Sequence, residues 1–121
     1  MIGRFKEAGI RTSVFIETDE AMIAAAPDTG TDRIELYTEQ YALDFEKDSE
    51  MAVAPFRNAA TQANELGLGI NAGHDLNLKN LRFFSQNVPG LMEVSIGHAL
   101  ISDSIYLGFE NAINMYKHQL R

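Results

Sequence analysis

Four short apolar runs alternate with stretches of helical pattern along this chain, and no other property limits its fold as strongly. The first run is rich in β-branched and aromatic residues, which is typical of a buried strand. We expect strands at residues 12–17, 33–38, 68–71 and 91–96. Strands that alternate with helices predict a parallel sheet joined by right-handed crossovers, so the fold class is α/β.

Helical patterns fill the intervals between these strands. Glycine or proline closes several of them, as is usual at helix ends. We expect helices at residues 1–9, at 21–26, from a start between 50 and 56 up to 66, at 77–86, and as one helix of about four turns over 105–120. Pro55 is best tolerated in the first turn of its helix. Residues 39–49 are expected to be a polar connection that covers a functional site.

Two of the expected strands end in the same pair of residues, glycine followed by histidine. Gly73 and His74 close one of them, and Gly97 and His98 close the next. A glycine lets the backbone turn sharply and come close to a ligand. Parallel α/β proteins place their ligands at the carboxyl ends of the strands. We therefore expect the two corners to lie side by side and form one site.

The length of the chain bounds the architecture. Its 121 residues predict one domain or less. Four βα units are half of a (β/α)₈ barrel, whose usual length is about 250 residues. Alone, four strands leave two open edges and one apolar inner face. The helical opening favours a fragment or half of such a barrel that must pair over the alternative, a small and complete doubly wound sheet.

Charge and composition exclude several classes of function. The formal charge of −7 argues against a nucleic-acid surface and against an anionic membrane face. Cysteine is absent, which excludes disulfides and thiolate catalysis. The first residues contain no apolar signal core, and no run reaches transmembrane length, so a cytoplasmic location is expected.

The residues of these strands resemble the pyridoxine 5'-phosphate synthase family. Residues 70–76 and 95–101 look like its last two strand ends, and residues 13–17 and 33–38 are similar to its fifth and sixth strands. The resemblance covers nearly all of this chain but only the C-terminal half of the family. It implies a (β/α)₈ barrel that forms a higher oligomer and uses no metal or organic cofactor. It also implies condensation of 3-amino-2-oxopropyl phosphate with 1-deoxy-D-xylulose 5-phosphate to pyridoxine 5'-phosphate, in vitamin B6 biosynthesis.

By this resemblance His74 is a proton donor, and Glu35 stabilises or orients the transition state. Closing a ring between an amine and a ketone moves protons near neutral pH, which suits imidazole. Each residue has a plainer interpretation. His74 could be a loop histidine that only holds its turn. Glu35, within an apolar strand, could pair with Arg33 or another interior cation, because a buried unpaired carboxylate is costly.

Gly97 and His98 match the family's phosphate-binding pair, while Gly73 and Asp75 line the neighbouring corner. Barrels often bind phosphate at the loops after strands seven and eight, through amides at a helix N-terminus. Many relatives carry glycine where this chain has Asp75. Its backbone amide is therefore the group expected to serve the substrate, and its carboxylate could instead cap the following helix.

The family's other catalytic histidine and glutamate, and most of its arginine contacts, have no counterpart here. The chain therefore carries one wall of an active site and is expected to be inactive until it pairs with an N-terminal half. One rival hypothesis is a divalent metal held by His74, Asp75 and His98 for hydrolysis. Another is a non-catalytic half-barrel that binds phosphates or self-associates.

Three polar positions near the C-terminus receive ordinary structural interpretations. Residues 102–104, Ser-Asp-Ser, are expected to be helix-start residues. His118 lies near the end of the final helical pattern. It is expected to be solvated or to complement the helix dipole rather than to bind a ligand.

Overall fold

The four strands form one parallel sheet, and they stand in it in the order of the sequence. The computed structural model describes all 121 residues. The strands are β1 (Ser13–Ile16), β2 (Arg33–Tyr37), β3 (Gly69–Gly73) and β4 (Leu91–Ser95). Each pairs in parallel with the next, with one irregularity in register between β3 and β4. The expected α/β class and the four expected strands are confirmed.

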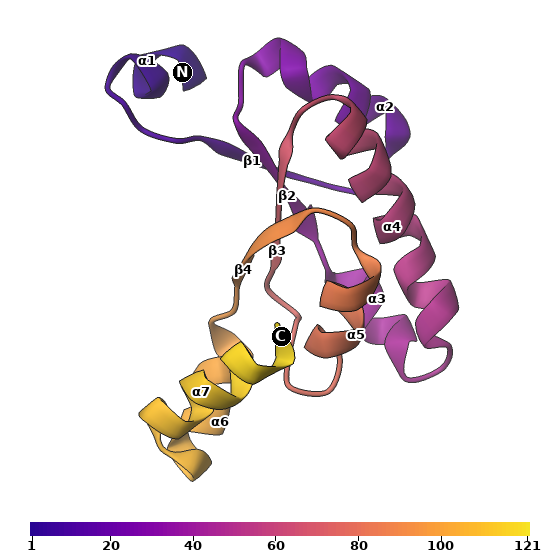
Figure 1. Cartoon of the computed structure of the whole chain (residues 1–121), viewed down its shortest axis with the longest axis vertical. Coiled ribbons are helices and arrows are strands. Elements are labelled where there is room, and N and C mark those ends of the chain that lie inside the picture. Colours follow the sequence, from indigo (N-terminus) through magenta and orange to yellow (C-terminus); the bar gives the residue numbers. More distant parts are fainter.

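Helices connect the strands, and most of them gather on one side of the sheet (Figure 1). They are α1 (Ile2–Glu7), α2 (Glu20–Ala25) with a following 3-10 turn (Ala26–Thr29), α3 (Glu39–Phe45), α4 (Ser49–Glu65), α5 (Leu81–Asn87), α6 (His98–Leu107) and α7 (Phe109–Gln119). In Figure 1 α2, α4 and α5 lie along the same side, whereas α6 and α7 lie beyond the carboxyl end of β4.

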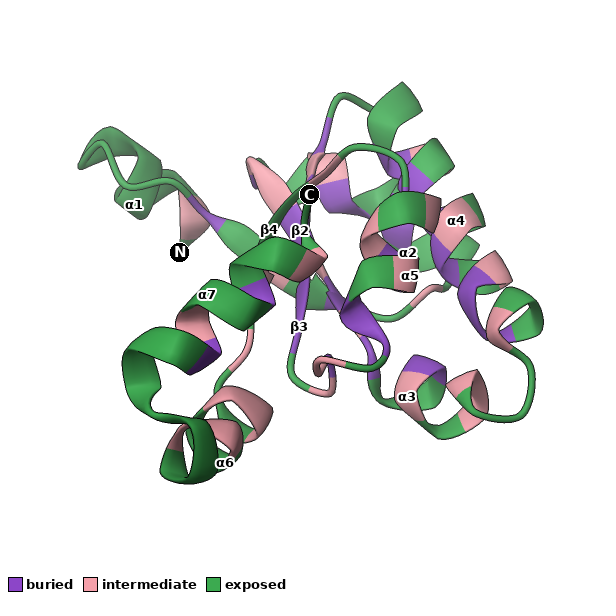
Figure 2. Cartoon of the chain, turned by 60° about the horizontal axis from the view of Figure 1, so that its bottom comes forward, coloured by how far each residue is buried: buried purple, intermediate pink, exposed green.

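The hydrophobic core lies between these helices and one face of the sheet (Figure 2). Side chains alternate along a strand, so one set faces the helices and the other faces away. Ile34 and Leu36 of β2 and Ile70 and Ala72 of β3 are fully buried on the helix side. On the other face Phe15 is 55% exposed. The helix α4 contributes the buried side chains Ala52, Val53, Phe56, Ala59, Ala60 and Ala63.

The expectation of a polar connection over residues 39–49 is wrong, because the helix α3 occupies most of this stretch. Tyr41 and Phe45 lie one helical turn apart and point toward the core. Tyr41 is fully buried and its ring centroid lies 4.8 Å from that of Phe84. Its hydroxyl donates a hydrogen bond of 2.8 Å to the carbonyl of Asn80. This aromatic contact and this hydrogen bond therefore anchor a stretch whose other residues are mostly polar.

The single helix expected over residues 105–120 is also wrong. Gly108 interrupts it with φ 80° and ψ 143°, a backbone conformation that favours glycine. The helix α6 begins at His98, so residues 102–104 lie inside it rather than at its start. The two helices pack together, and the hydroxyl of Tyr116 donates to the carboxylate of Asp103 at 2.7 Å.

The helix α4 begins earlier than expected, at Ser49. The carboxylate of Asp48 accepts a hydrogen bond from the amide of Met51 at 3.0 Å and so caps the helix. Pro55 therefore lies inside α4 instead of in its first turn. Because proline has no N–H group, the helix loses one backbone hydrogen bond at this position.

The helix α5 begins later than expected, at Leu81 instead of residue 77. A hydrogen-bonded turn precedes it. The amide of Asn77 donates to the side-chain oxygen of Asn80 at 2.8 Å, and the side-chain oxygen of Asn77 accepts from the amide of Lys79 at 2.9 Å. These local bonds compete with helix formation, as asparagine side chains commonly do.

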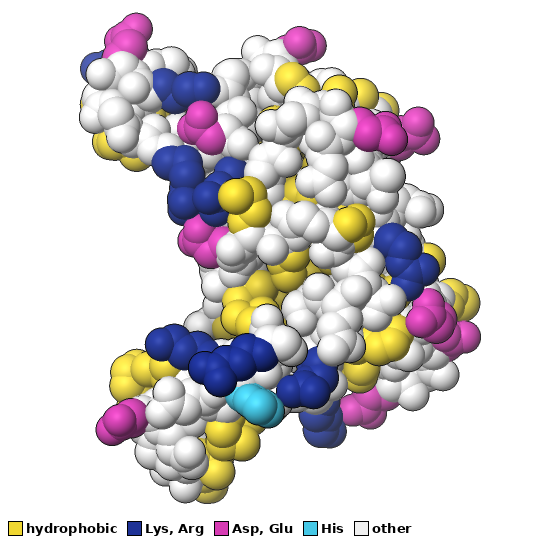
Figure 3. Space-filling model, viewed as in Figure 1, with side chains coloured by type: hydrophobic (Ala, Val, Ile, Leu, Met, Phe, Trp, Pro, Cys, Tyr) yellow, Lys and Arg dark blue, Asp and Glu magenta, His cyan; other side chains and the backbone are white.

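The expectation that His118 is solvated is confirmed, because its side chain is exposed. Lys117 and His118 occupy the last turn of α7, where positive charge complements the helix dipole. Figure 3 shows basic side chains beside a histidine over this part of the molecule. No helix combines the length and the apolar character that crossing a bilayer requires.

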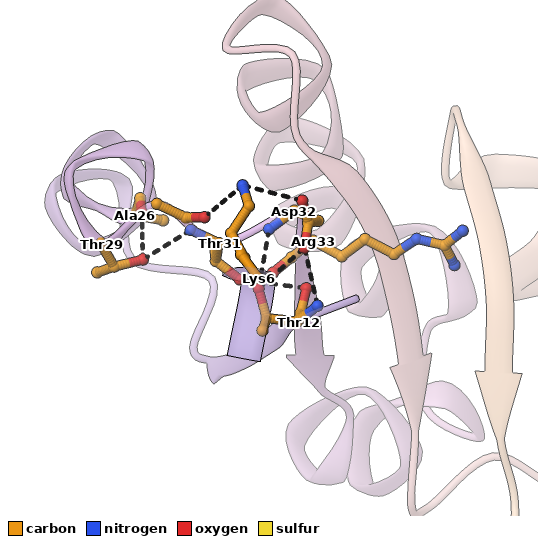
Figure 4. A network of polar contacts seen from close by, with 8 residues as sticks. Lys6, Thr12, Ala26, Thr29, Thr31, Asp32 and Arg33 are labelled. Atoms are coloured by element: carbon orange, nitrogen blue, oxygen red, sulfur yellow. Dashed lines mark hydrogen bonds and ion pairs between the residues drawn. The ribbon is translucent and has the colours of Figure 1, made fainter. Parts of the chain in front are cut away.

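Asp32 joins the N-terminal segment to the start of β2 (Figure 4). Its carboxylate accepts hydrogen bonds from the amide and the hydroxyl of Thr12, at 2.8 and 3.0 Å. It also forms an ion pair of 3.1 Å with Lys6. The Thr12 amide, followed by Lys6, lowers the pKa of Asp32 from 3.8 to about 2. This carboxylate therefore favours the folded chain when it is ionised.

We predict that Asp32 gives the chain an acid-dependent stability. Its pKa in the folded state is below its unfolded value, so the contribution is complete above about pH 4 and is lost as the pH falls toward about 2. Replacing Asp32→Asn should reduce stability at neutral pH and flatten this part of the pH profile. Urea unfolding between pH 2 and 7 measures it. An unchanged slope between pH 4 and 2 in the variant would contradict the assignment.

Candidate functional site

The carboxyl-terminal side of the sheet contains an open cavity of about 480 Å³. Its wall consists of Glu35, Ser95, Ile96, the two histidines that follow β3 and β4, and Gly97. His74 comes directly after β3, and His98 is the first residue of α6. The structure thus brings Glu35, His74, Gly97 and His98 together, as expected from neighbouring parallel strands.

Gly73 is needed because β3 and β4 approach closely at their ends. It lies opposite Ser95 in the strand register. A Cβ atom at Gly73 would lie 2.2 Å from the backbone carbonyl oxygen of Ser95. The amide of the next residue, His74, donates to that same carbonyl at 3.0 Å. Gly73 therefore acts on the site through packing and does not itself line the cavity.

His74 has a backbone conformation that is unusual for any residue other than glycine. Its φ of 74° is positive, and it is the one non-glycine residue of the chain for which this holds. Such a conformation costs about 1–3 kcal/mol and is enriched at functional sites. The imidazole is exposed and forms no hydrogen bond within the chain. Its ring meets that of Phe15 edge-on at a centroid distance of 5.8 Å.

Glu35 is half-buried on the face of the sheet that points away from the helices. The alternative interpretation pairs it with Arg33, but that guanidinium group has other partners. It donates to the side-chain oxygen of Asn71 at 3.0 Å and to the carboxylate of Glu93 at 2.9 Å. Arg11 also pairs with Glu93, at 2.8 Å. Glu35 has no ion-pair partner in the chain and faces the cavity.

Asp75 does not cap the following helix, whereas its contact with the substrate stays a prediction. Its amide already donates to the carbonyl of Gly73 at 3.1 Å and to the hydroxyl of Thr38 at 3.3 Å. Its carboxylate does not cap the following helix, because α5 begins at Leu81 and its capping residue is Asn80. Asp75 is also not among the residues that line the cavity.

The rival metal site is not formed. Binding a divalent ion requires several histidine or carboxylate ligands close together. The chain contains no group of three or more histidine, cysteine, aspartate or glutamate residues arranged to hold a metal ion. His74, Asp75 and His98 therefore do not make the cluster that this hypothesis needs.

Sequence reasoning missed Ser95 and Thr38. Ser95 ends β4 and lines the cavity. Thr38 follows β2 and is fully buried, and its hydroxyl contacts the corner after β3. Neither residue belongs to the Gly-His pattern. A threonine at the end of a β-branched run looks like one more strand residue, so no local signal distinguishes it.

Tyr37 adds a polar group to the same end of β2. Its hydroxyl donates to the carboxylate of Glu39 at 2.7 Å. This hydrogen bond to a carboxylate raises the pKa of Tyr37. The ring of Tyr37 lies 5.2 Å from that of Phe15, centroid to centroid. The two rings thus form an aromatic surface beside His74.

The whole chain is similar to proteins of one family. The family model described as "Pyridoxal phosphate biosynthesis protein PdxJ" matches residues 1–121. A pyridoxine 5'-phosphate synthase of Flavobacterium johnsoniae is 55% identical over 121 residues, which are 100% of this chain and 51% of that protein. One of Christiangramia forsetii is 59% identical over 116 residues, 96% of this chain and 49% of the relative. One of Porphyromonas gingivalis is 58% identical over 120 residues, 99% and 50% respectively. The chain spans about half the length of these curated relatives.

Proposed function

Because this chain belongs to the pyridoxal phosphate biosynthesis protein PdxJ family, we propose that it supplies the C-terminal half of a (β/α)₈ barrel and one wall of a pyridoxine 5'-phosphate synthase active site. The observation that carries this proposal is the cavity in which Glu35, His74, Gly97 and His98 meet. Glu35 lies in the middle of β2, and the other three residues follow the carboxyl ends of β3 and β4, where barrel enzymes place their reacting groups.

The sheet has the properties of half a barrel. Its strands follow the order of the sequence, so β1 and β4 each have one neighbour and one open edge. Its second face carries Phe15, Arg33, Glu35, Asn71 and Glu93, a set that mixes charged groups with an exposed aromatic ring. Four further strands would pair both edges and enclose this face.

A partner is therefore part of the proposal. The N-terminal half of the barrel would bring the remaining substrate contacts. The surface of α6 and α7 also exposes large apolar side chains, which supports association with a second copy of the chain. These exposed residues are Ile101, Ile105, Tyr106 and Phe109. Below, "reconstituted enzyme" means this chain combined with the N-terminal half of the Flavobacterium johnsoniae relative.

The reaction joins 3-amino-2-oxopropyl phosphate to 1-deoxy-D-xylulose 5-phosphate. The amine of the first substrate attacks the ketone carbon of the second, and the ketone oxygen leaves as water when the imine forms. Ring closure then releases a second water and inorganic phosphate. Each departing oxygen needs a proton, and the free imidazole of His74 is placed to donate one. The carboxylate of Glu35, across the cavity, stabilises positive charge that develops on the nitrogen during the condensation.

The substrate phosphate binds at the start of α6. Gly97 is the capping residue of this helix of 10 residues, and no side chain caps its free amides. Amides at a helix N-terminus attract an anion, and the imidazole of His98 adds a further donor. A Cβ atom at Gly97 would meet no atom within 4 Å, so the space beside it is open to a ligand.

We expect Gly97→Ala to weaken phosphate binding without unfolding the chain. The added methyl group occupies the open space where the anion would approach, and a loss of about 1.4 kcal/mol in binding corresponds to tenfold weaker affinity. The cost in stability should be about 1 kcal/mol or less, because alanine is a poorer helix cap than glycine. Amide NMR titration of the labelled chain with 3-amino-2-oxopropyl phosphate measures the affinity.

The same titration tests the location of the site. With the wild-type chain, shifts should be confined to residues 73–76 and 97–99. The variant Gly3→Ala is the control, because its added methyl group meets no atom within 4 Å and it lies in α1. It should bind like the wild type. Shifts centred away from these two corners would contradict the proposed phosphate site.

A further inference from the structure

The side chain of Thr38 contacts the residues on both sides of His74, which is proposed to donate the proton. Thr38 is fully buried at the end of β2, more than thirty residues before the corner after β3. Its hydroxyl donates to the carbonyl of Gly73 and accepts a hydrogen bond of 3.3 Å from the amide of Asp75. These are the residues directly before and after His74, so a single hydroxyl group holds both flanks of that residue.

Thr38 gives up a more usual role to make these contacts. It is the capping residue of α3, a position where threonine normally accepts a hydrogen bond from the first turn of the helix. No such bond is present, and the first turn of α3 has no side-chain cap. The hydroxyl is directed across to β3 instead. The local helix thus goes without its cap while the corner around His74 is fixed.

The corner needs to be held because of its backbone. His74 has a φ of 74°, and a non-glycine residue keeps such a conformation only where its surroundings impose it. Four hydrogen bonds hold the corner. Two involve Thr38, and a third joins the amide of His74 to the carbonyl of Ser95 at 3.0 Å. The fourth is local and joins the amide of Asp75 to the carbonyl of Gly73 at 3.1 Å. A return to an ordinary φ would turn the imidazole away from Glu35 and His98.

We propose that Thr38 is the positioning residue for His74. It does not line the cavity and acts only by locking the backbone from which the imidazole projects. The inference rests on the proposed function, because it takes His74 as the proton donor. If the imidazole of His74 is misoriented, proton transfer in the chemical step slows. Substrate affinity depends instead on the phosphate contacts at α6.

The test compares Thr38→Val with Thr38→Ser in the reconstituted enzyme. Valine keeps the shape of threonine and removes the hydroxyl, whereas serine keeps the hydroxyl. We expect Thr38→Val to lower kcat about 10- to 100-fold, since small errors of position have effects of this size, with KM for both substrates changed less than about threefold. Thr38→Ser should restore kcat to within about threefold of the wild type. Equal losses in both variants would overturn the proposal.

Introducing the same substitution into a His74→Gln enzyme distinguishes a positioning role of Thr38 from general damage to the fold. If Thr38 acts through His74, Thr38→Val should cause no further loss of kcat in a His74→Gln enzyme, because coupled residues are not additive. A further loss of the same size would refute the proposal. Thr38→Ala provides the comparison if the valine variant does not fold, and its kcat should fall by the same factor.

The backbone of His74 gives a readout that is independent of turnover. The Cα and Cβ chemical shifts of His74 report its φ and ψ angles. They should move away from left-handed values in Thr38→Ala and remain in place in Thr38→Ser. Unchanged shifts in the alanine variant would overturn the proposal even if activity falls. By contrast, full activity in His74→Gln alone would reject the role of His74 while leaving the hydroxyl's effect on these shifts to be judged separately.

Discussion

Replacing His74→Gln is expected to lower kcat of the reconstituted enzyme about 10²- to 10⁴-fold, the usual contribution of a general acid or base. Glutamine keeps a polar side chain of similar reach but cannot donate a proton as imidazolium does. The side chain is exposed and forms no hydrogen bond within the chain, so little stability should be lost. Steady-state formation of pyridoxine 5'-phosphate measures the effect.

His118→Gln is the matched control for this substitution. It makes the same chemical change at an exposed position in the last turn of α7, outside the cavity. Its kcat should equal that of the wild type. Turnover by His74→Gln within about threefold of this control would show that another group donates the proton.

Gly73→Ala is expected to be the most damaging small substitution in the fold. The added Cβ atom would lie 2.2 Å from the carbonyl oxygen of Ser95, which is backbone and cannot swing aside. Relief therefore requires β3 and β4 to separate at the site. Overpacking of this kind costs about 3 kcal/mol. Urea unfolding should show a large fall in the midpoint, and both Gly-His corners should lose their amide dispersion.

Gly3→Ala controls for the general effect of replacing glycine by alanine. Its Cβ atom meets no neighbouring atom, and alanine favours a helix more than glycine does. The midpoint of this variant should be equal to or above that of the wild type. If Gly73→Ala unfolds at the same urea concentration as Gly3→Ala, then the close approach of β3 to Ser95 does not limit the fold.

The sequence allowed the sheet to be predicted because local pattern and tertiary burial agree there. Ile34 and Leu36 alternate with polar residues in β2, and this spacing alone identifies the face that packs on the helices. The site followed from the same regularity. Since neighbouring parallel strands end at one edge, the pairs after β3 and β4 had to meet. The resemblance of these residues to one family is confirmed by the match over residues 1–121.

Two of the errors, the missed α3 and the missed break at Gly108, come from contacts between residues that are not neighbours in the sequence. The helix α3 is held by Tyr41, whose ring packs on Phe84 and whose hydroxyl reaches Asn80. The break at Gly108 depends on α7 folding back on α6, where Tyr116 meets Asp103. Periodicity reports which residues share a face, and it does not report where a chain turns back.

The residues of the candidate site divide in the same way. His74 and His98 follow conspicuous glycines, and so they can be found from the sequence. Thr38 reaches the corner after β3 through hydrogen bonds to residues 35 and 37 positions away, and only the folded chain reveals them. The capping role considered for Asp75 is wrong, because α5 begins at Leu81 and its capping residue is Asn80.

Product formation by the reconstituted enzyme is the measurement that bears most directly on the proposed function. This chain and the N-terminal half of the Flavobacterium johnsoniae relative are each assayed alone and then combined, with both phosphorylated substrates present. We predict that pyridoxine 5'-phosphate forms only in the mixture and that His74→Gln removes most of it. A mixture that assembles and binds phosphate yet yields no product would contradict the proposal and favour a non-catalytic, phosphate-binding half-barrel.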